Sequence, residues 1–139
     1  MKLDLSTDFG KRVARRLSEE RIIWFTTVGA DGMPQTRPVW FLWDGETILI
    51  YTRPEGRKIA HLVRAPKVSL NFDGDGKGGD IIVFTGEATV DHAAPPPAQN
   101  EAYLAKYAEG IKRIGMDRDA FGTAYHVAIR VGALKVRGH

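Results

Sequence analysis

Short runs of β-branched and aromatic residues, each closed by a glycine or proline turn, constrain this chain most strongly. Such runs predict strands, and tight turns connect strands that are neighbours in an antiparallel sheet. The predicted strands cover residues 22–28, 35–43, 47–52, 68–72, 81–90 and 123–131, with the tail 134–137 as a further short strand. Six to seven short antiparallel strands indicate a mainly β fold that closes into a barrel.

The segments between these strands predict helices inserted into the barrel. After a cap at Thr7 or Asp8, apolar residues recur at helical spacing, and the opposite face carries Lys11, Arg12, Arg15 and Arg16, which we expect to face solvent. Further helices are predicted after the turn at 53–56, over 101–109 and after Asp117. At 139 residues and 43% apolar composition, we expect one domain over residues 1–139, because the proline run 95–97 is too short to separate two.

Composition removes several kinds of chemistry. The chain has no cysteine, so it has no disulfide, thiol nucleophile or thiolate metal site. Its histidines are far apart in sequence and show no metal-ligand spacing, and no serine lies in a nucleophile motif. We therefore predict neither a metal site nor a catalytic side chain, and any difficult chemistry would belong to a bound cofactor.

Charge and hydropathy exclude other partners. The net charge of +3 suits an anionic ligand, but 17 acidic residues spread through the chain argue against a nucleic-acid surface. No apolar run approaches the roughly 18 residues that a membrane span needs. The first residues lack a signal-peptide pattern, so we expect a cytoplasmic protein without a membrane span.

A cationic turn is the clearest sign of function. Arg53, Arg57 and Lys58 lie between the end of a predicted strand and the start of a short helix. The first amides of a helix lack internal partners and carry partial positive charge, so this end attracts anions. Basic residues are unfavourable there unless an anion is bound. A phosphate is the expected ligand, and a solvated basic turn is the alternative.

The second predicted strand is also unusual. Pro34 and Pro38 remove two amide donors, so this strand is expected to lie incompletely paired. Free backbone groups can then bind a heterocycle, beside a wall formed by Trp40, Phe41 and Trp43. At least two of these aromatic residues are expected in the core. A hairpin at Asp44-Gly45 leads toward the cationic turn, so a ring and a phosphate of one molecule could be bound together.

An ordered set of short motifs runs through nearly the whole chain. These are Gly29-x-x-Gly32-x-Pro34, Pro38-Val39-Trp40, Asp44-Gly45, Tyr51-Thr52-x5-Lys58 with Leu62, Pro66-x-Val68-Ser69-Leu70 and Gly86-x-Ala88. The set resembles the split β-barrel flavin and deazaflavin oxidoreductases, the FMN-binding superfamily that includes the pyridoxamine-phosphate oxidases. Within it, the chain is most similar to the branch that binds the deazaflavin F420.

This resemblance implies a split β-barrel and a homodimer with the cofactor between the subunits. It implies phosphate contacts from Thr52, Arg57 and Lys58. Contacts to the deazaflavin ring are implied for Gln35, Thr36, Arg37, Pro38 and Val39. The implied activity is hydride transfer from reduced F420 to an activated double bond of a small organic substrate, such as an enone, lactone or quinone. The protein would orient the reactants and exclude water.

Two other interpretations stay open at this stage. An FMN-binding oxidoreductase on the same barrel needs a phosphate at the same turn, so the sequence separates it poorly from an F420 enzyme. A deazaflavin-binding carrier with little turnover is also consistent with a chain that offers no acid or base.

Overall fold

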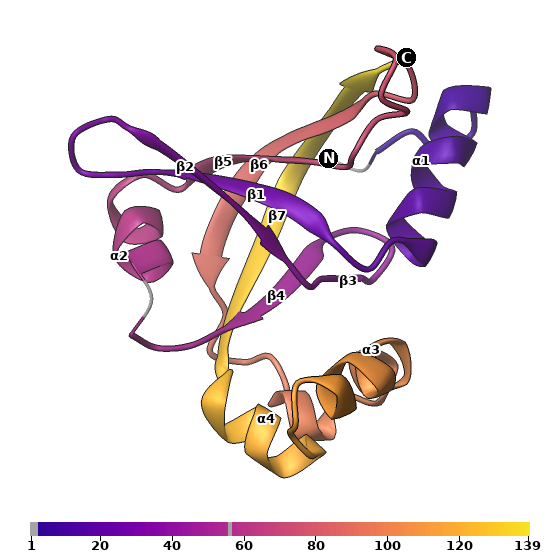
Figure 1. Cartoon of the computed structure of the whole chain (residues 1–139). Coiled ribbons are helices and arrows are strands. Elements are labelled where there is room, and N and C mark those ends of the chain that lie inside the picture. The colour runs from indigo at the N-terminus through magenta and orange to yellow at the C-terminus, as the bar shows by residue number, and fades with distance from the viewer. Residues whose placement is uncertain (1–2, 56) are drawn as a thin grey trace.

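A seven-stranded sheet, curled on itself, forms the body of the computed structural model (Figure 1). The structure describes residues 3–55 and 57–139, and for Arg57 it describes the backbone alone. The strands are β1 Ile23–Val28, β2 Pro34–Val39, β3 Leu42–Trp43, β4 Ile48–Thr52, β5 Lys67–Asn71, β6 Ile82–Val90 and β7 Val127–Gly138. Their order is β2-β1-β5-β6-β7-β4-β3, and all neighbours are antiparallel. The prediction of a mainly β split barrel is confirmed.

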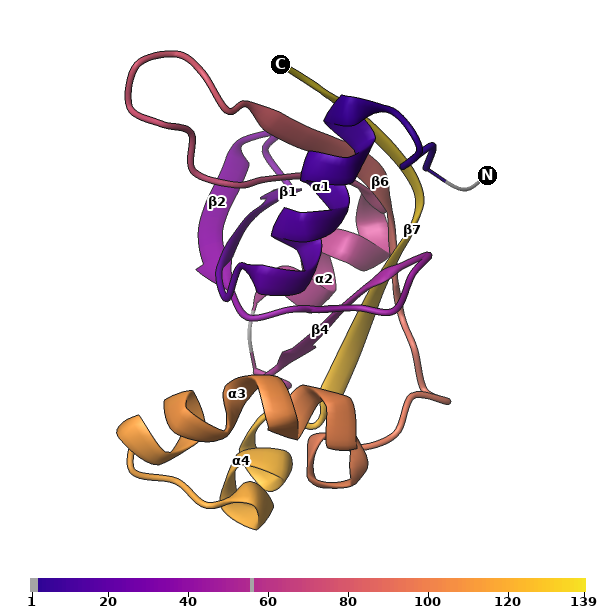
Figure 2. The ribbon, with the colours of Figure 1, turned by 90° about the vertical axis from the view of Figure 1, so that its right-hand side faces the viewer.

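Helices are inserted around this sheet as the sequence predicts. They are α1 Asp8–Glu19, α2 Arg57–Arg64, α3 Glu101–Arg113 and α4 Arg118–Ala124, with a 3-10 turn at Pro97–Gln99. Thr7, Asn100 and Asp117 cap α1, α3 and α4, because each side chain accepts a backbone N–H of the first turn. Figures 1 and 2 show α3 and α4 together at one end of the sheet, apart from α1 and α2.

Two hydrophobic clusters hold the fold together. One fills the curl of the sheet beneath α1, and the other lies where α3 and α4 pack against β4 and β7. Every residue of β4 is buried because the strand contributes to both clusters: Ile48 and Ile50 belong to the first, Leu49 and Tyr51 to the second. A strand covered on both faces reads as a continuous apolar run, and this explains the sequence Ile-Leu-Ile-Tyr.

The prediction of one continuous strand over residues 35–43 is wrong, because this segment forms two strands, β2 and β3. β2 and β3 lie at opposite edges of the sheet and are joined by Trp40 and Phe41. The hydroxyl of Tyr107, on α3, accepts the Phe41 amide at 2.8 Å and lies 2.9 Å from the Phe41 carbonyl oxygen. A side chain thus satisfies the backbone at this crossing in place of a neighbouring strand, and the sheet is split here.

The predicted C-terminal strands are also corrected. α4 continues to Ala124, so the strand begins at Val127 and not at 123, and the tail belongs to the same strand. A bulge interrupts the β6–β7 pairing between Thr85 and Glu87, where Ala133 has φ of 50°. A Cβ on Gly86 would lie 2.8 Å from the Gly132 carbonyl oxygen, so this motif glycine is required by the bulge.

The sequence predicts that the basic face of α1 lies in solvent. For Arg16 this prediction is wrong, because the residue is only 7% exposed. Its guanidinium binds Asp80 at 3.1 Å and Glu20, and lies 5.0 Å from the centre of the Phe72 ring. Arg12 binds the same Asp80 carboxylate at 2.8 Å. These cations therefore fasten α1 over the sheet and to the 73–81 loop.

Candidate functional site

A cavity of about 390 Å³ opens where β4 ends, between β2 and helices α3 and α4. We call it the aromatic cavity. Its lining residues are Ile22, Pro38, Val39, Trp40, Tyr51, Thr52, Lys58, Tyr103, Ile114, Phe121 and Tyr125. Four residues that the sequence assigns to the cofactor are therefore brought to one place: Pro38, Val39, Thr52 and Lys58.

Stacked aromatic rings build one wall of the aromatic cavity. Trp40 stacks on Tyr107 with ring centres 4.7 Å apart and on Phe121 at 5.6 Å. Phe121 in turn stacks on Tyr125 at 4.6 Å. The planes of successive rings differ by 8° to 19°, so the four rings form one nearly parallel stack. Trp40 is therefore held firmly beside the cavity.

A polar cleft of about 520 Å³ holds two further predicted site residues. We call it the arginine cleft; Gly29, Ala30, Asp31, Gln35, Arg37 and His61 line it. His61 lies on α2, and its Nδ1 is 3.2 Å from the hydroxyl oxygen of the fully buried Thr27 on β1. This bond fixes the ring beside Arg37 and Gln35.

Lys58 and Arg37 bring two positive charges together between the two clefts. Lys58 lies in the first turn of α2 and lines the aromatic cavity, while Arg37 lines the arginine cleft. Partial burial, and secondarily the positive charge of Arg37, lower the pKa of Lys58. Among the salt bridges of the described residues, none involves either side chain. Two cations in this position form a site suited to an anion.

The β2 side chains that were predicted to contact the cofactor ring do not all lie on the same face of the sheet. The register with β1 pairs Thr36 with Thr26, and their hydroxyl oxygens lie 2.7 Å apart on one face. Gln35 and Arg37 alternate to the other face, as strand geometry requires. Because β2 is an edge strand, a ligand that meets all five residues would contact its free backbone edge. The side chain of Arg57 lies outside the described residues.

Sequence reasoning missed the residues that complete the aromatic cavity. Tyr103, Ile114, Phe121 and Tyr125 come from the segment between β6 and β7, far along the chain from β2. The shared helical face of Tyr103 and Tyr107 was a weak signal. Nothing in the sequence placed that face against Trp40.

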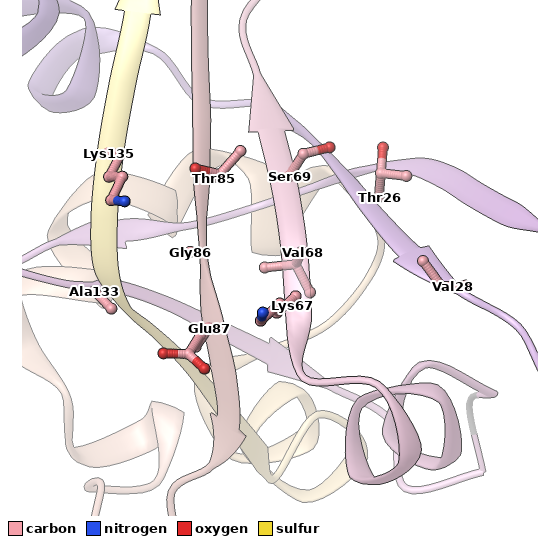
Figure 3. Close-up of a pocket in the computed structure, with 10 residues that line it drawn as sticks. All are labelled: Thr26, Val28, Lys67, Val68, Ser69, Thr85, Gly86, Glu87, Ala133 and Lys135. Atoms are coloured by element: carbon pink, nitrogen blue, oxygen red, sulfur yellow. The ribbon is translucent and has the colours of Figure 1, made fainter. Parts of the chain in front are cut away.

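A third cleft, which we call the outer cleft, shares no lining residue with the other two. Figure 3 shows its side chains on β1, β5, β6 and β7, among them Lys67, Thr85, Glu87 and Lys135. These four side chains are exposed. The face therefore presents both signs of charge.

Metal and membrane features can be assessed for residues 3–55 and 57–139. Within them, no cluster of three or more histidine, cysteine, aspartate or glutamate side chains could hold a metal ion. No described helix combines the length and apolar character of a membrane span.

The family follows from comparison with known proteins. The model of the family described as pyridoxamine 5'-phosphate oxidase matches residues 9–137, nearly the whole chain. The chain belongs to this family. The match spans the whole sheet up to β7 and includes every residue of both clefts. A comparison with curated protein sequences gives no match.

Solved structures share the fold. A Clostridium acetobutylicum protein of the pyridoxinephosphate oxidase family is 21% identical, covers 96% of this chain and 92% of its own, and has a TM-score of 0.66. An F420 reductase is 23% identical, with 87% and 94% covered and a TM-score of 0.58. The heme storage protein HutZ from Vibrio cholerae is 17% identical, with 98% and 95% covered and a TM-score of 0.61. At these identities the likeness concerns the fold alone.

Proposed function

We propose that this protein is an F420H2-dependent reductase. It transfers a hydride from the reduced deazaflavin to an activated double bond of a small organic substrate, such as an enone, a lactone or a quinone. The observation that carries this proposal is the convergence of Lys58 and Arg37, without an ion pair among the described residues, beside an aromatic-walled cavity. An anionic cofactor with a flat ring fits both the pair of cations and the aromatic wall.

The side chains present fit such a cofactor. Lys58 would hold a phosphate oxygen, together with Thr52 at the end of β4 and Arg57 at the start of α2. The edge of β2, from Gln35 to Val39, would lie along the ring. When bound, the cofactor supplies the hydride. The chain's own residues bind and orient the reactants, and the aromatic wall keeps water from the reacting atoms.

An FMN-binding oxidoreductase is the second candidate. The same cations suit the phosphate of FMN, and the same β2 edge suits its ring. A deazaflavin carrier is the third, because the sequence offers no identifiable catalytic acid or base. Oxidation of bound F420H2 by an added enone or quinone separates a reductase from a carrier.

We propose that the protein is a homodimer with the cofactor between its subunits. The outer cleft offers a surface for the second copy, because Lys67 and Lys135 share a face with Glu87. A twofold axis places each patch against its own copy, so a face with both signs of charge can pair with itself.

Binding titrations on purified, cofactor-free protein test the proposed function. Trp40 follows directly after β2, so F420 with its ring along the β2 edge should quench tryptophan fluorescence. We expect tight binding of F420 and weak binding of FMN. The reverse preference would move the protein to the flavin branch. Binding of neither would remove the cofactor, and with it the proposed reductase.

A further inference from the structure

The aromatic cavity contains a buried hydroxyl that the fold does not use. Tyr103 lies on α3, is 0% exposed as a residue and lines the cavity. Its hydroxyl makes no side-chain hydrogen bond to another described residue, unlike those of Tyr51 and Tyr107. Among the described residues, however, no fully enclosed side-chain polar atom is left without a partner. Tyr103 therefore meets the cavity at its wall, with a hydroxyl that has no side-chain hydrogen-bond partner among the described residues.

The surroundings of this hydroxyl favour a flat ligand that accepts a hydrogen bond. Trp40 and Phe121 cover one another within the ring stack, so they offer the cavity their ring edges. Ring edges carry partial positive charge and attract oxygen atoms and electron-rich faces. The lining residues include no carboxylate, and Lys58 adds a positive charge. A conjugated carbonyl compound matches this lining in shape and in polarity.

We propose that the aromatic cavity is the substrate site of the proposed reductase, and that Tyr103 is the residue that selects substrates by donating its O–H to a conjugated carbonyl oxygen. This inference rests on the proposed function for its chemistry, but it makes a claim about binding that holds without the cofactor. Tyr103 is thus a specificity-determining residue for planar enones and quinones.

The role of the hydroxyl in the reaction is that of a donor. When a hydride from the reduced cofactor adds to the β-carbon of an enone, the π electrons move to the carbonyl oxygen. The Tyr103 O–H stabilises the resulting negative charge, and a proton from water then adds to the α-carbon to give the saturated ketone. Burial, and then the neighbouring tyrosines 107, 51 and 125, raise the pKa of Tyr103, so the phenol stays protonated at neutral pH.

A matched pair of ligands tests this role by equilibrium dialysis against cofactor-free protein. The probes are 2-methyl-1,4-naphthoquinone and 2-methylnaphthalene, which share a ring system but differ in their oxygens. The chain has no cysteine, so the quinone has no thiol to modify. We expect Tyr103→Phe to weaken quinone binding by about 3- to 10-fold, the range of one neutral hydrogen bond, and to leave 2-methylnaphthalene binding unchanged.

Tyr107→Phe is the matched control on the same helix. Its hydroxyl bonds the backbone at Phe41 and Arg21. This variant should lose thermal stability and keep quinone affinity, whereas Tyr103→Phe should keep stability and lose affinity. Equal quinone binding by Tyr103→Phe and the parent protein would overturn the inference, as would equal loss for both probes or no binding of the quinone by the parent protein. Failure of F420 to bind would instead overturn the proposed function and leave this result standing.

Discussion

Lys58 is the residue on which the proposed cofactor binding depends most directly. Its ammonium group is partly buried beside Arg37, so a phosphate there would be bound by a charge-assisted hydrogen bond. We expect Lys58→Ala to weaken binding of the cofactor by roughly 1.5–3 kcal/mol, measured by tryptophan quenching. Lys11→Ala, an exposed lysine on α1, makes the same change in net charge and should have no effect. Equal affinities for Lys58→Ala and the parent protein would place the phosphate elsewhere.

Lys106 gives the protein a pH dependence of stability. Its ammonium donates to the Phe41 carbonyl oxygen at 3.0 Å and lies 3.7 Å from the centre of the Phe41 ring. Burial, and secondarily Arg21, lower its pKa to about 8. Between about pH 8 and 10 the unfolded chain therefore binds more protons than the native state, so the free energy of unfolding rises with pH over this window.

Lys106→Met should flatten that rise. The pKa of Lys58 is also lowered, so the free energy of unfolding should still rise with pH in Lys106→Met, but less steeply. Denaturant unfolding at pH 7.5, 8.5 and 9.5 measures the effect, with the exposed Lys112→Met as the control. The window stays below the range in which Tyr103 and Tyr107, with raised pKa values, act in the opposite sense. A slope as steep in Lys106→Met as in the parent protein would refute the assignment.

At the scale of elements, α3 is shaped to receive the crossing between β2 and β3. A Cβ on Gly110 would lie 2.9 Å from the end of the Trp40 ring, which is fixed by its stacked neighbours. Gly110→Ala gains helix propensity of up to about 1 kcal/mol but forces this ring to move. We expect a net loss of about 1 kcal/mol, seen as a fall in Tm of roughly 3–6 °C. Glu109→Ala, one residue away and exposed, should leave Tm unchanged or raise it.

Sequence patterns predicted the elements that obey local rules. The helix starts after Thr7, Asn100 and Asp117 were predicted, and these side chains bind amides only three residues along the chain. The break in strand 35–43 could not be predicted, because it depends on the Tyr107 hydroxyl, more than sixty residues away. The burial of Arg16 likewise depends on Asp80, which only the folded chain brings to α1.

The candidate site divides in the same way. Lys58, Thr52, Pro38 and Val39 were predicted from the ordered motifs that resemble the family, although β2 and β4 are not neighbours in the sheet. The tyrosines and Phe121 were missed, since their position depends on how α3 and α4 return to β4. Local chemistry identified the cations, and tertiary packing supplied the cavity.

At the scale of the whole molecule, the proposed dimer predicts a coupling between assembly and cofactor binding. Thr85→Arg adds a bulky cation to the exposed outer cleft, beside Lys67 and Lys135. We expect sedimentation velocity to show a shift from dimer to monomer and, with it, weaker cofactor binding. Thr123→Arg adds the same charge on α4, away from the outer cleft, and should remain dimeric. A monomeric parent protein would contradict the proposal.

Two separate parts of the chain form the candidate site, so each part can diverge independently among related proteins. Residues that would hold the anionic cofactor lie on the barrel before β5, whereas Tyr103, Ile114, Phe121 and Tyr125 all lie in the stretch 91–126. Insertion, deletion or substitution within that stretch can remodel the aromatic part of the cavity lining and leave Lys58 and Arg37 in place. Descendants of one ancestral barrel can therefore retain a cofactor and exchange substrates by altering a single contiguous segment.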